Sequence, residues 1–186
     1  MSATIEKQEL TIGSDAPDFT LPGIDGINYS LHTLIDSKQA VVVIFSCNHC
    51  PYVQAYEERL IALQHEFVAQ NVALVCVNSN DDTNYPQDSY SEMIIRAQRE
   101  EFNFLYLRDH TQQVARTFGA KYTPEAYLFD HEGILRYNGR IDDNWQDPAL
   151  VKDQTLREAI RAVLSGQTVA SPVTHAIGCT IKWKPA

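Results

Sequence analysis

Two short runs of β-branched, apolar residues mark the first half of the chain, over residues 40–45 and 72–77. Each run predicts a strand that is buried on both faces, as in a parallel sheet. Between the runs, apolar side chains recur at spacings of three and four, which predicts an amphipathic helix. They are Val53, Tyr56, Leu60, Leu63 and Phe67. Strand, helix and strand in this order predict a right-handed parallel crossover.

Shorter elements follow. The pattern predicts a helix around Met93 to Ala97, a strand over residues 104–107, a short helix over 114–118 that ends at Gly119, a hairpin of residues 126–129 and 134–137, and a last helix over about 152–164. Asp109 and Gln112 have the spacing of a capping box.

The remaining segments frame this core. Residues up to about 30 look extended, and residues 166–186 look like an irregular tail. The prediction is one domain over residues 1–186: an α/β sandwich whose central mixed sheet is flanked by helices, with parallel strands first and an antiparallel pair last.

Charge and composition narrow the class of protein. The 186 residues are 44% hydrophobic and carry a formal net charge of −9, which argues against a general affinity for nucleic acid or anionic membrane. The apolar run at 40–45 is too short to span a bilayer, and residues 1–7 lack the pattern of a secretory signal. We therefore expect a cytoplasmic protein without nucleic-acid or membrane partners.

Four cysteines carry the candidate chemistry, and two of them form a C-x-x-C pair, Cys47 and Cys50. In a cytoplasmic protein such a pair is redox-active or metal-binding. It lies between a predicted strand and a predicted helix, and Pro51 suits the first helical position. Because a helix N-terminus favours an anion, the pKa of Cys47 is expected to fall below its free value of about 8.5. Cys47 would attack a disulfide, and Cys50 would resolve the mixed disulfide.

The neighbouring residues leave alternatives open. A protonated His49 would favour the thiolate further, although it also fits a solvated turn. Cys76, inside the second strand, is expected to be a core residue. A zinc site would need further ligands, such as His175 and Cys179. No second C-x-x-C exists.

Three segments give the chain a family resemblance: Gly13 with residues 16–21, residues 45–53 around the two cysteines, and residues 123–125. Through them the chain resembles the thioredoxin-like superfamily, in particular its redoxin and peroxiredoxin-like branch. It is also similar to bacterial peroxiredoxin-like proteins of unassigned function that share the Cys-Asn-His-Cys centre, the Gly-Arg-Ile-Asp-Asp stretch at 139–143 and the tail at 178–184.

The resemblance implies roles and also shows departures. It implies that Pro124 is cis and faces the two sulfurs, and that Thr123 offers its backbone to an extended substrate segment. Val41 and its neighbours are apolar where thioredoxins carry a buried acid. Ala40 and Ile44 stand where peroxiredoxins carry a proline and a threonine, which argues against peroxidase activity.

The leading hypothesis is a thiol–disulfide oxidoreductase that acts on protein or small-molecule disulfides, needs no cofactor and receives electrons from an upstream reductase or a small thiol. Cys179 is a candidate relay thiol, with a packed tail residue as the alternative, and Trp183 is expected to anchor the tail by apolar burial. A thiol peroxidase and a non-enzymatic metal-binding module are the rival hypotheses.

Overall fold

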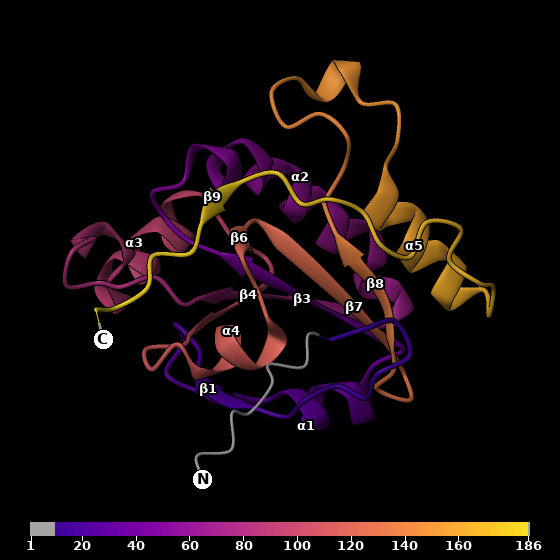
Figure 1. The fold of residues 1–186 in the computed structure, drawn as a ribbon, viewed down its shortest axis with the longest axis horizontal. Helices are drawn as coiled ribbons and strands as arrows, with labels where there is room; N and C mark the ends of the chain where they lie inside the picture. Colours follow the sequence, from indigo (N-terminus) through magenta and orange to yellow (C-terminus); the bar gives the residue numbers. More distant parts are fainter. Residues whose placement is uncertain (1–9, 186) are drawn as a thin grey trace, which may run out of the picture.

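The structure, a computed structural model, describes residues 10–185 (Figure 1). Residues 1–7, on which the prediction about a secretory signal rests, lie outside this range. Within the described range, every helix is too short or too polar to cross a membrane.

The centre of the molecule is a five-stranded mixed sheet with the strand order β5-β4-β3-β7-β8. Its strands are β3 (Ala40–Ser46), β4 (Val72–Asn78), β5 (Leu105–Arg108), β7 (Glu125–Asp130) and β8 (Leu135–Gly139). Strand β4 runs parallel to β3 and β5, whereas β7 runs antiparallel to β3 and β8. The predicted parallel half and antiparallel hairpin are confirmed.

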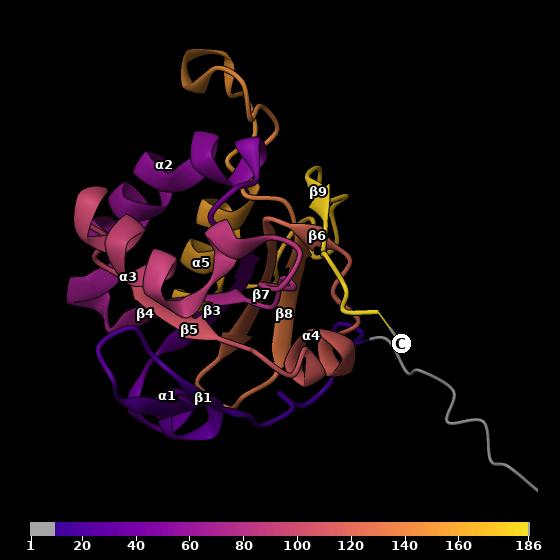
Figure 2. The ribbon, with the colours of Figure 1, turned by 90° about the vertical axis from the view of Figure 1, so that its left-hand side faces the viewer.

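Helices cover both faces of this sheet (Figures 1 and 2). The side chains of β3 alternate between two cores: Val42 and Ile44 pack on one face, and Val43 and Phe45 on the other. The first face is covered by α2 (Pro51–Phe67), α3 (Tyr90–Arg99) and α5 (Thr155–Leu164), and the second by α1 (Leu31–Ser37) and α4 (Gln113–Phe118). The α/β sandwich expected from the sequence is confirmed.

Helix α2 follows the predicted stripe closely. All five apolar positions at spacings of three and four are buried, and Pro51 is the first helical residue. The last helix is shorter than predicted. It begins at Thr155 instead of about residue 152, and the loop before it contains a 3-10 turn, Pro148–Leu150, that projects from the sheet (Figure 1).

Several short elements escaped the sequence pattern. Helix α1 follows an antiparallel pair, β1 (Thr20–Pro22) with β2 (Asn28–Ser30), and Ser30 caps it by accepting from the Thr33 N–H. In the tail, β9 (Cys179–Thr180) pairs with β6 (Tyr122–Thr123), so the tail is not wholly irregular. Two paired residues are too few to produce a visible alternation of polar and apolar positions.

The predicted capping box before α4 is wrong. Gln112 adopts a left-handed conformation, and its side-chain amide donates to the carbonyls of Ser79 and Lys182 instead of returning to Asp109. The Asp109 carboxylate accepts from the Ala115 N–H and the Ser79 hydroxyl. Because Ser79 and Lys182 lie in distant segments, the local spacing alone could not predict these contacts.

Candidate active site

The two cysteines of the C-x-x-C pair meet at the carboxyl end of the sheet. Cys47 directly follows β3, and Cys50 is the N-cap residue of α2. Both are buried, at 1% and 0% exposure, and pack with Val53. The strand fixes the first sulfur and the helix fixes the second, as the sequence predicts.

Thr123 contacts both sulfurs from a distant part of the chain. The Cys50 thiol donates to the Thr123 carbonyl oxygen at 3.3 Å, and Cys47 Sγ lies 3.6 Å from the Thr123 hydroxyl. The Thr123–Pro124 peptide bond is cis, as the resemblance implies. The Thr123 segment is thus placed beside the sulfurs, where the resemblance implies it to be.

Hydrogen bonding makes the two thiols differ in acidity. Donation by the Cys47 thiol to Cys50, together with burial and the nearby Asp88 charge, raises the pKa of Cys47 well above its ordinary value. The same hydrogen bond lowers the pKa of Cys50 to about 5 despite burial, with further donation from Cys179 and from the Val53 N–H. The predicted fall in the pKa of Cys47 is therefore wrong for the reduced pair. The helix N-terminus stabilises the sulfur of its own N-cap residue instead.

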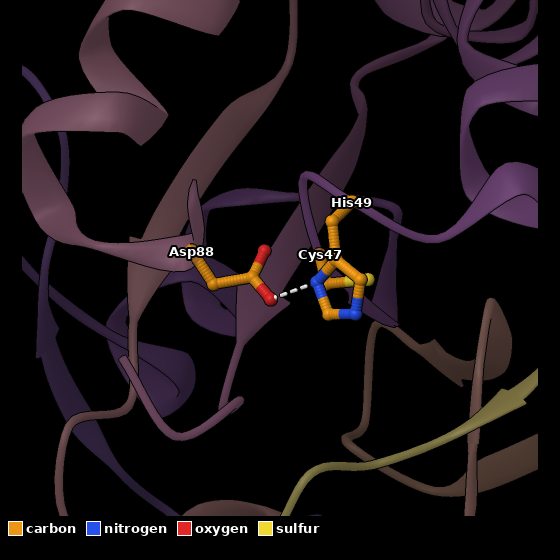
Figure 3. A group of neighbouring side chains, drawn as sticks. All are labelled: Cys47, His49 and Asp88. Carbon is orange, nitrogen blue, oxygen red and sulfur yellow. Dashed lines mark hydrogen bonds and ion pairs between the residues drawn. The ribbon is translucent and has the colours of Figure 1, made fainter. Parts of the chain in front are cut away.

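A histidine–carboxylate pair lies next to Cys47 (Figure 3). His49 Nδ1 is hydrogen-bonded to the Asp88 carboxylate, and the imidazole stacks on the Tyr85 ring at a centroid distance of 5.1 Å. Ligand atoms of Cys47, His49 and Asp88 all lie within 4.8 Å of one another. His49 is therefore held by two partners and is not a freely solvated turn residue.

Asp88 is the site residue that sequence reasoning missed. It is fully buried at the end of a 3-10 turn, Pro86–Asp88, and accepts from the Asn48 N–H at 2.6 Å and from Asn80 Nδ2 at 2.9 Å. Asn80 belongs to the polar loop that follows the second predicted strand. The available signal was that loop's position beyond the carboxyl end of a parallel strand, a place where sites gather.

The further ligands that a zinc site would need, His175 and Cys179, do not come together with the pair in one group. The His175 ring packs edge-on against Tyr122 at 5.8 Å, whereas Cys179 packs against the Cys47–Cys50 cluster. Within residues 10–185 the group with metal-binding geometry is instead Cys47, His49 and Asp88. Both carboxylate oxygens of Asp88 already accept hydrogen bonds, which weakens this group as a metal site.

The other predicted positions have mixed outcomes. Cys76 is a buried core residue, as predicted, and burial raises its pKa. Trp183 remains 38% exposed, so the predicted apolar burial is wrong. The Arg116 guanidinium lies over the Trp183 ring at 4.5 Å, so a cation–π contact holds the indole instead.

Comparison with known protein families agrees with this geometry. The model of the AhpC/TSA family matches residues 12–138. The chain belongs to the AhpC/TSA family. This match confirms the predicted redoxin and peroxiredoxin-like branch and an oxidoreductase class, and both the disulfide and the peroxide hypotheses are compatible with it.

Individual relatives span most of the chain. A Helicobacter pylori protein that bears the name peroxiredoxin bcp is 29% identical over 129 residues, which cover 69% of this chain and 79% of that protein. A hypothetical protein of Sinorhizobium meliloti has a similar structure, with 36% identity, a TM-score of 0.87, and coverage of 96% of this chain and 98% of that one. An uncharacterized conserved protein of Geobacillus kaustophilus shows 36% identity and a TM-score of 0.89, with coverage of 95% and 94%.

Proposed function

We propose that this AhpC/TSA-family protein is a dithiol–disulfide oxidoreductase whose redox couple is Cys47 and Cys50. One observation carries the proposal: both sulfurs lie together, at the junction of β3 and α2, against the Thr123 hydroxyl and carbonyl. A pair so placed can close a disulfide without rearranging the sheet, and neither sulfur needs a cofactor for thiol exchange.

Thr123 supports the proton arrangement that makes Cys47 the nucleophile. When the proton shared by the two sulfurs moves from Cys47 to Cys50, the Thr123 hydroxyl donates to the Cys47 thiolate, and the Thr123 carbonyl accepts from the Cys50 thiol. The hydroxyl contact lowers the pKa of Cys47 and opposes the effects that raise it. Thr123 thus makes the reactive form accessible from the resting form, in which Cys50 carries the charge.

The reaction then follows two exchange steps. The Cys47 thiolate attacks one sulfur of a substrate disulfide, which forms a mixed disulfide and releases the other sulfur as a thiolate. The Cys50 thiol gives its proton to the substrate thiolate just released. The Cys50 thiolate then attacks Cys47 Sγ, closes the Cys47–Cys50 disulfide and releases the second substrate thiolate. The substrate gains two electrons and the protein loses them. A dithiol reductase or a small thiol restores the pair.

His49 and Asp88 fit a positioning role in this sequence. Asp88 fixes the imidazole through Nδ1, beside Cys47. A proton leaving Cys47 for solvent therefore has an oriented imidazole within reach. We assign His49 the adjustment of the Cys47 thiolate, and Asp88 the orientation of His49.

The test is reduction of a small aromatic disulfide by the purified protein, with Cys47→Ser, Cys50→Ser and the core variant Cys76→Ala compared with wild type. We expect Cys47→Ser to be inactive and Cys50→Ser to accumulate a mixed disulfide with substrate, detected by intact mass. Cys76→Ala controls for the loss of one thiol and should retain activity. A Cys47→Ser protein that keeps wild-type turnover would overturn the proposal.

A peroxidase is the second candidate, because the Thr123 hydroxyl lies beside Cys47 although position 44 lacks the expected threonine. This hydroxyl could donate to a peroxide oxygen at Cys47. The test is sulfenic-acid trapping on Cys50→Ser after one equivalent of hydrogen peroxide. Modification of Cys47 within seconds supports peroxide reduction. Modification no faster than that of free cysteine rejects it.

The natural partners are part of the proposal. Redox proteins of this fold act on thiols and disulfides. Three points stay predictions: whether the substrate is a protein or a small-molecule disulfide, which reductase lies upstream, and the cytoplasmic location. A mixed disulfide trapped on Cys50→Ser in cells would identify the substrate by its mass.

A further inference from the structure

The C-terminal tail is docked on the same segment that holds the redox pair. Strand β9 pairs antiparallel with β6, which places Cys179 opposite Thr123. Beyond it, the Ile181 N–H donates to the Lys121 carbonyl at 3.1 Å, and the Ile181 side chain is buried at 3% exposure. The tail is therefore fixed to this edge by both backbone and side-chain contacts.

A second set of contacts joins the tail to the loop after β4 and to Gln112. The Lys182 N–H donates to Asn80 Oδ1 at 2.9 Å, and the Lys182 carbonyl accepts from the Asp81 N–H at 2.8 Å and from Gln112 Nε2 at 2.8 Å. Asn80 also donates to Asp88, which in turn binds His49. The tail and the active-site loop thus form one hydrogen-bonded unit.

The fit at Thr123 requires a glycine. A Cβ added at Gly178 would lie 2.2 Å from the Thr123 carbonyl oxygen, the same oxygen that accepts from Cys50. The tail backbone therefore approaches the redox centre as closely as a chain without a side chain allows.

Cys179 completes a cluster of three sulfurs. It packs against the cluster of Cys47, Cys50 and Val53, and hydrogen bonding from Cys179 is among the causes that lower the pKa of Cys50. Cys47 and Cys50 are 1% and 0% exposed, whereas Cys179 is only partly buried. Cys179 is thus the most solvent-exposed of the three cysteines.

We propose that Cys179 is the exit thiol of the centre: it takes over the disulfide from Cys47 by forming a Cys50–Cys179 bond, and it presents that bond to the external reductant. In this step the Cys179 thiolate attacks Cys50 Sγ. The Cys50–Cys179 bond forms, the Cys47–Cys50 bond breaks, and Cys47 leaves as a thiolate that takes up the proton lost by Cys179. The exchange is redox-neutral. A thiolate of a small thiol or of a dithiol reductase then attacks Cys179 Sγ, and Cys50 leaves as a thiolate. A second reductant thiolate attacks the reductant sulfur bound to Cys179, which frees Cys179 and forms the disulfide of the reductant. The reductant therefore never has to reach the buried pair.

This inference rests on the proposed function, because it needs the Cys47–Cys50 disulfide as its starting point. The two are tested separately. Cys179→Ser must still form the Cys47–Cys50 disulfide, since neither partner is changed; failure there counts against the proposed function. Cys47→Ser, which cannot form that disulfide, must form Cys50–Cys179 when treated with diamide.

The experiment has two measurements. Peptide mapping of each oxidised, acid-quenched and alkylated protein identifies its disulfide. The rate at which glutathione reduces each oxidised protein is then measured. We expect a Cys50–Cys179 peptide in Cys47→Ser and a reduction rate in Cys179→Ser at least about tenfold below wild type. Thr180→Ala, also on β9, should behave as wild type. Cys50 and Cys179 both remaining free in diamide-treated Cys47→Ser, or an unchanged reduction rate in Cys179→Ser, would overturn the inference. A thermal melt of each variant confirms folding, and Cys179→Ala replaces the serine variant if that one melts early.

Discussion

The sulfur of Cys50 is surrounded by hydrogen-bond donors: the thiols of Cys47 and Cys179 and the N–H groups of Val53 and Cys179. A negative charge on this sulfur is therefore stabilised in the reduced protein. Stabilising the reduced form makes the corresponding disulfide a stronger oxidant. We expect the Cys47–Cys50 pair to be more oxidising than a pair of ordinary thiols.

The acidity of Cys50 gives a pH prediction. Since the pKa of Cys50 is lowered to about 5, the thiolate stabilises the fold fully above the higher unfolded pKa, and this contribution disappears as the pH falls through about 5. Thiolate absorbance of the reduced protein should titrate near this value. Replacing Cys47 with alanine removes the main donor and should move the midpoint upward. A midpoint that stays in place would show that the other donors suffice.

Asp88 supports more than His49. The carboxylate also accepts from the Asn48 N–H and from Asn80, so Asp88→Ala leaves several buried donors without an acceptor. We expect it to lower the free energy of unfolding by about 3 kcal/mol, and His49→Ala by about 1 kcal/mol, in urea titrations. Equal losses would mean that the carboxylate matters to stability only through the imidazole.

For single residues, the sequence predicted which cysteines form the site better than it predicted which sulfur carries the negative charge. Cys47, Cys50 and Cys76 are where the pattern of strand and helix indicates. The hydrogen bonds that bring Asp88 and Thr123 to the site join residues 40 and 73 positions apart, Asn48 with Asp88 and Cys50 with Thr123. Local spacing carries no record of such contacts.

Among the elements, strand β9 depends on a close backbone contact between Gly178 and Thr123, which leaves no room for a side chain at position 178. Gly178→Ala places a methyl group against the Thr123 carbonyl, so we expect the strand to leave the β6 edge while the sheet stays folded. Hydrogen exchange at the Ile181 N–H, which donates to Lys121, should become fast.

Thr180→Ala on the same strand is the matched control and should keep the slow exchange. Slow exchange in Gly178→Ala as well would show that Ile181 and Lys182 hold the tail without the close approach.

The sequence predicted the long helix α2 from its stripe of apolar positions. It could not predict β9, whose position depends on one glycine and on the distant Asn80 and Gln112.

For the whole molecule, Tyr137 joins the sheet to two outer segments. Its buried hydroxyl donates to the Arg140 carbonyl at 2.6 Å and contacts the hydroxyls of Thr155 on α5, at 3.1 Å, and Thr174 in the tail, at 2.6 Å. Tyr137→Phe should therefore cost about 2 kcal/mol of unfolding free energy, measured by denaturant titration.

The exposed hydroxyl of Tyr29, which donates to Asp25, provides the comparison, and Tyr29→Phe should cost about 0.5 kcal/mol or less. Similar losses for the two variants would contradict a linking role for Tyr137.

The arrangement of the sheet itself was predictable, because buried runs and one crossover leave few alternatives. The docking of the tail was not predictable, because it depends on a two-residue strand pairing, the burial of Ile181 and single polar contacts.

The pairing of β9 with β6 also bears on how copies of this protein meet. A strand edge that is filled by the chain's own tail has the geometry to receive the same tail from a second copy, and such an exchange would give a domain-swapped dimer. In such a dimer Cys179 of one copy would lie beside Cys50 of the other. Oxidation at high protein concentration would then lock the swap covalently, and a non-reducing gel would show it as a band of twice the mass.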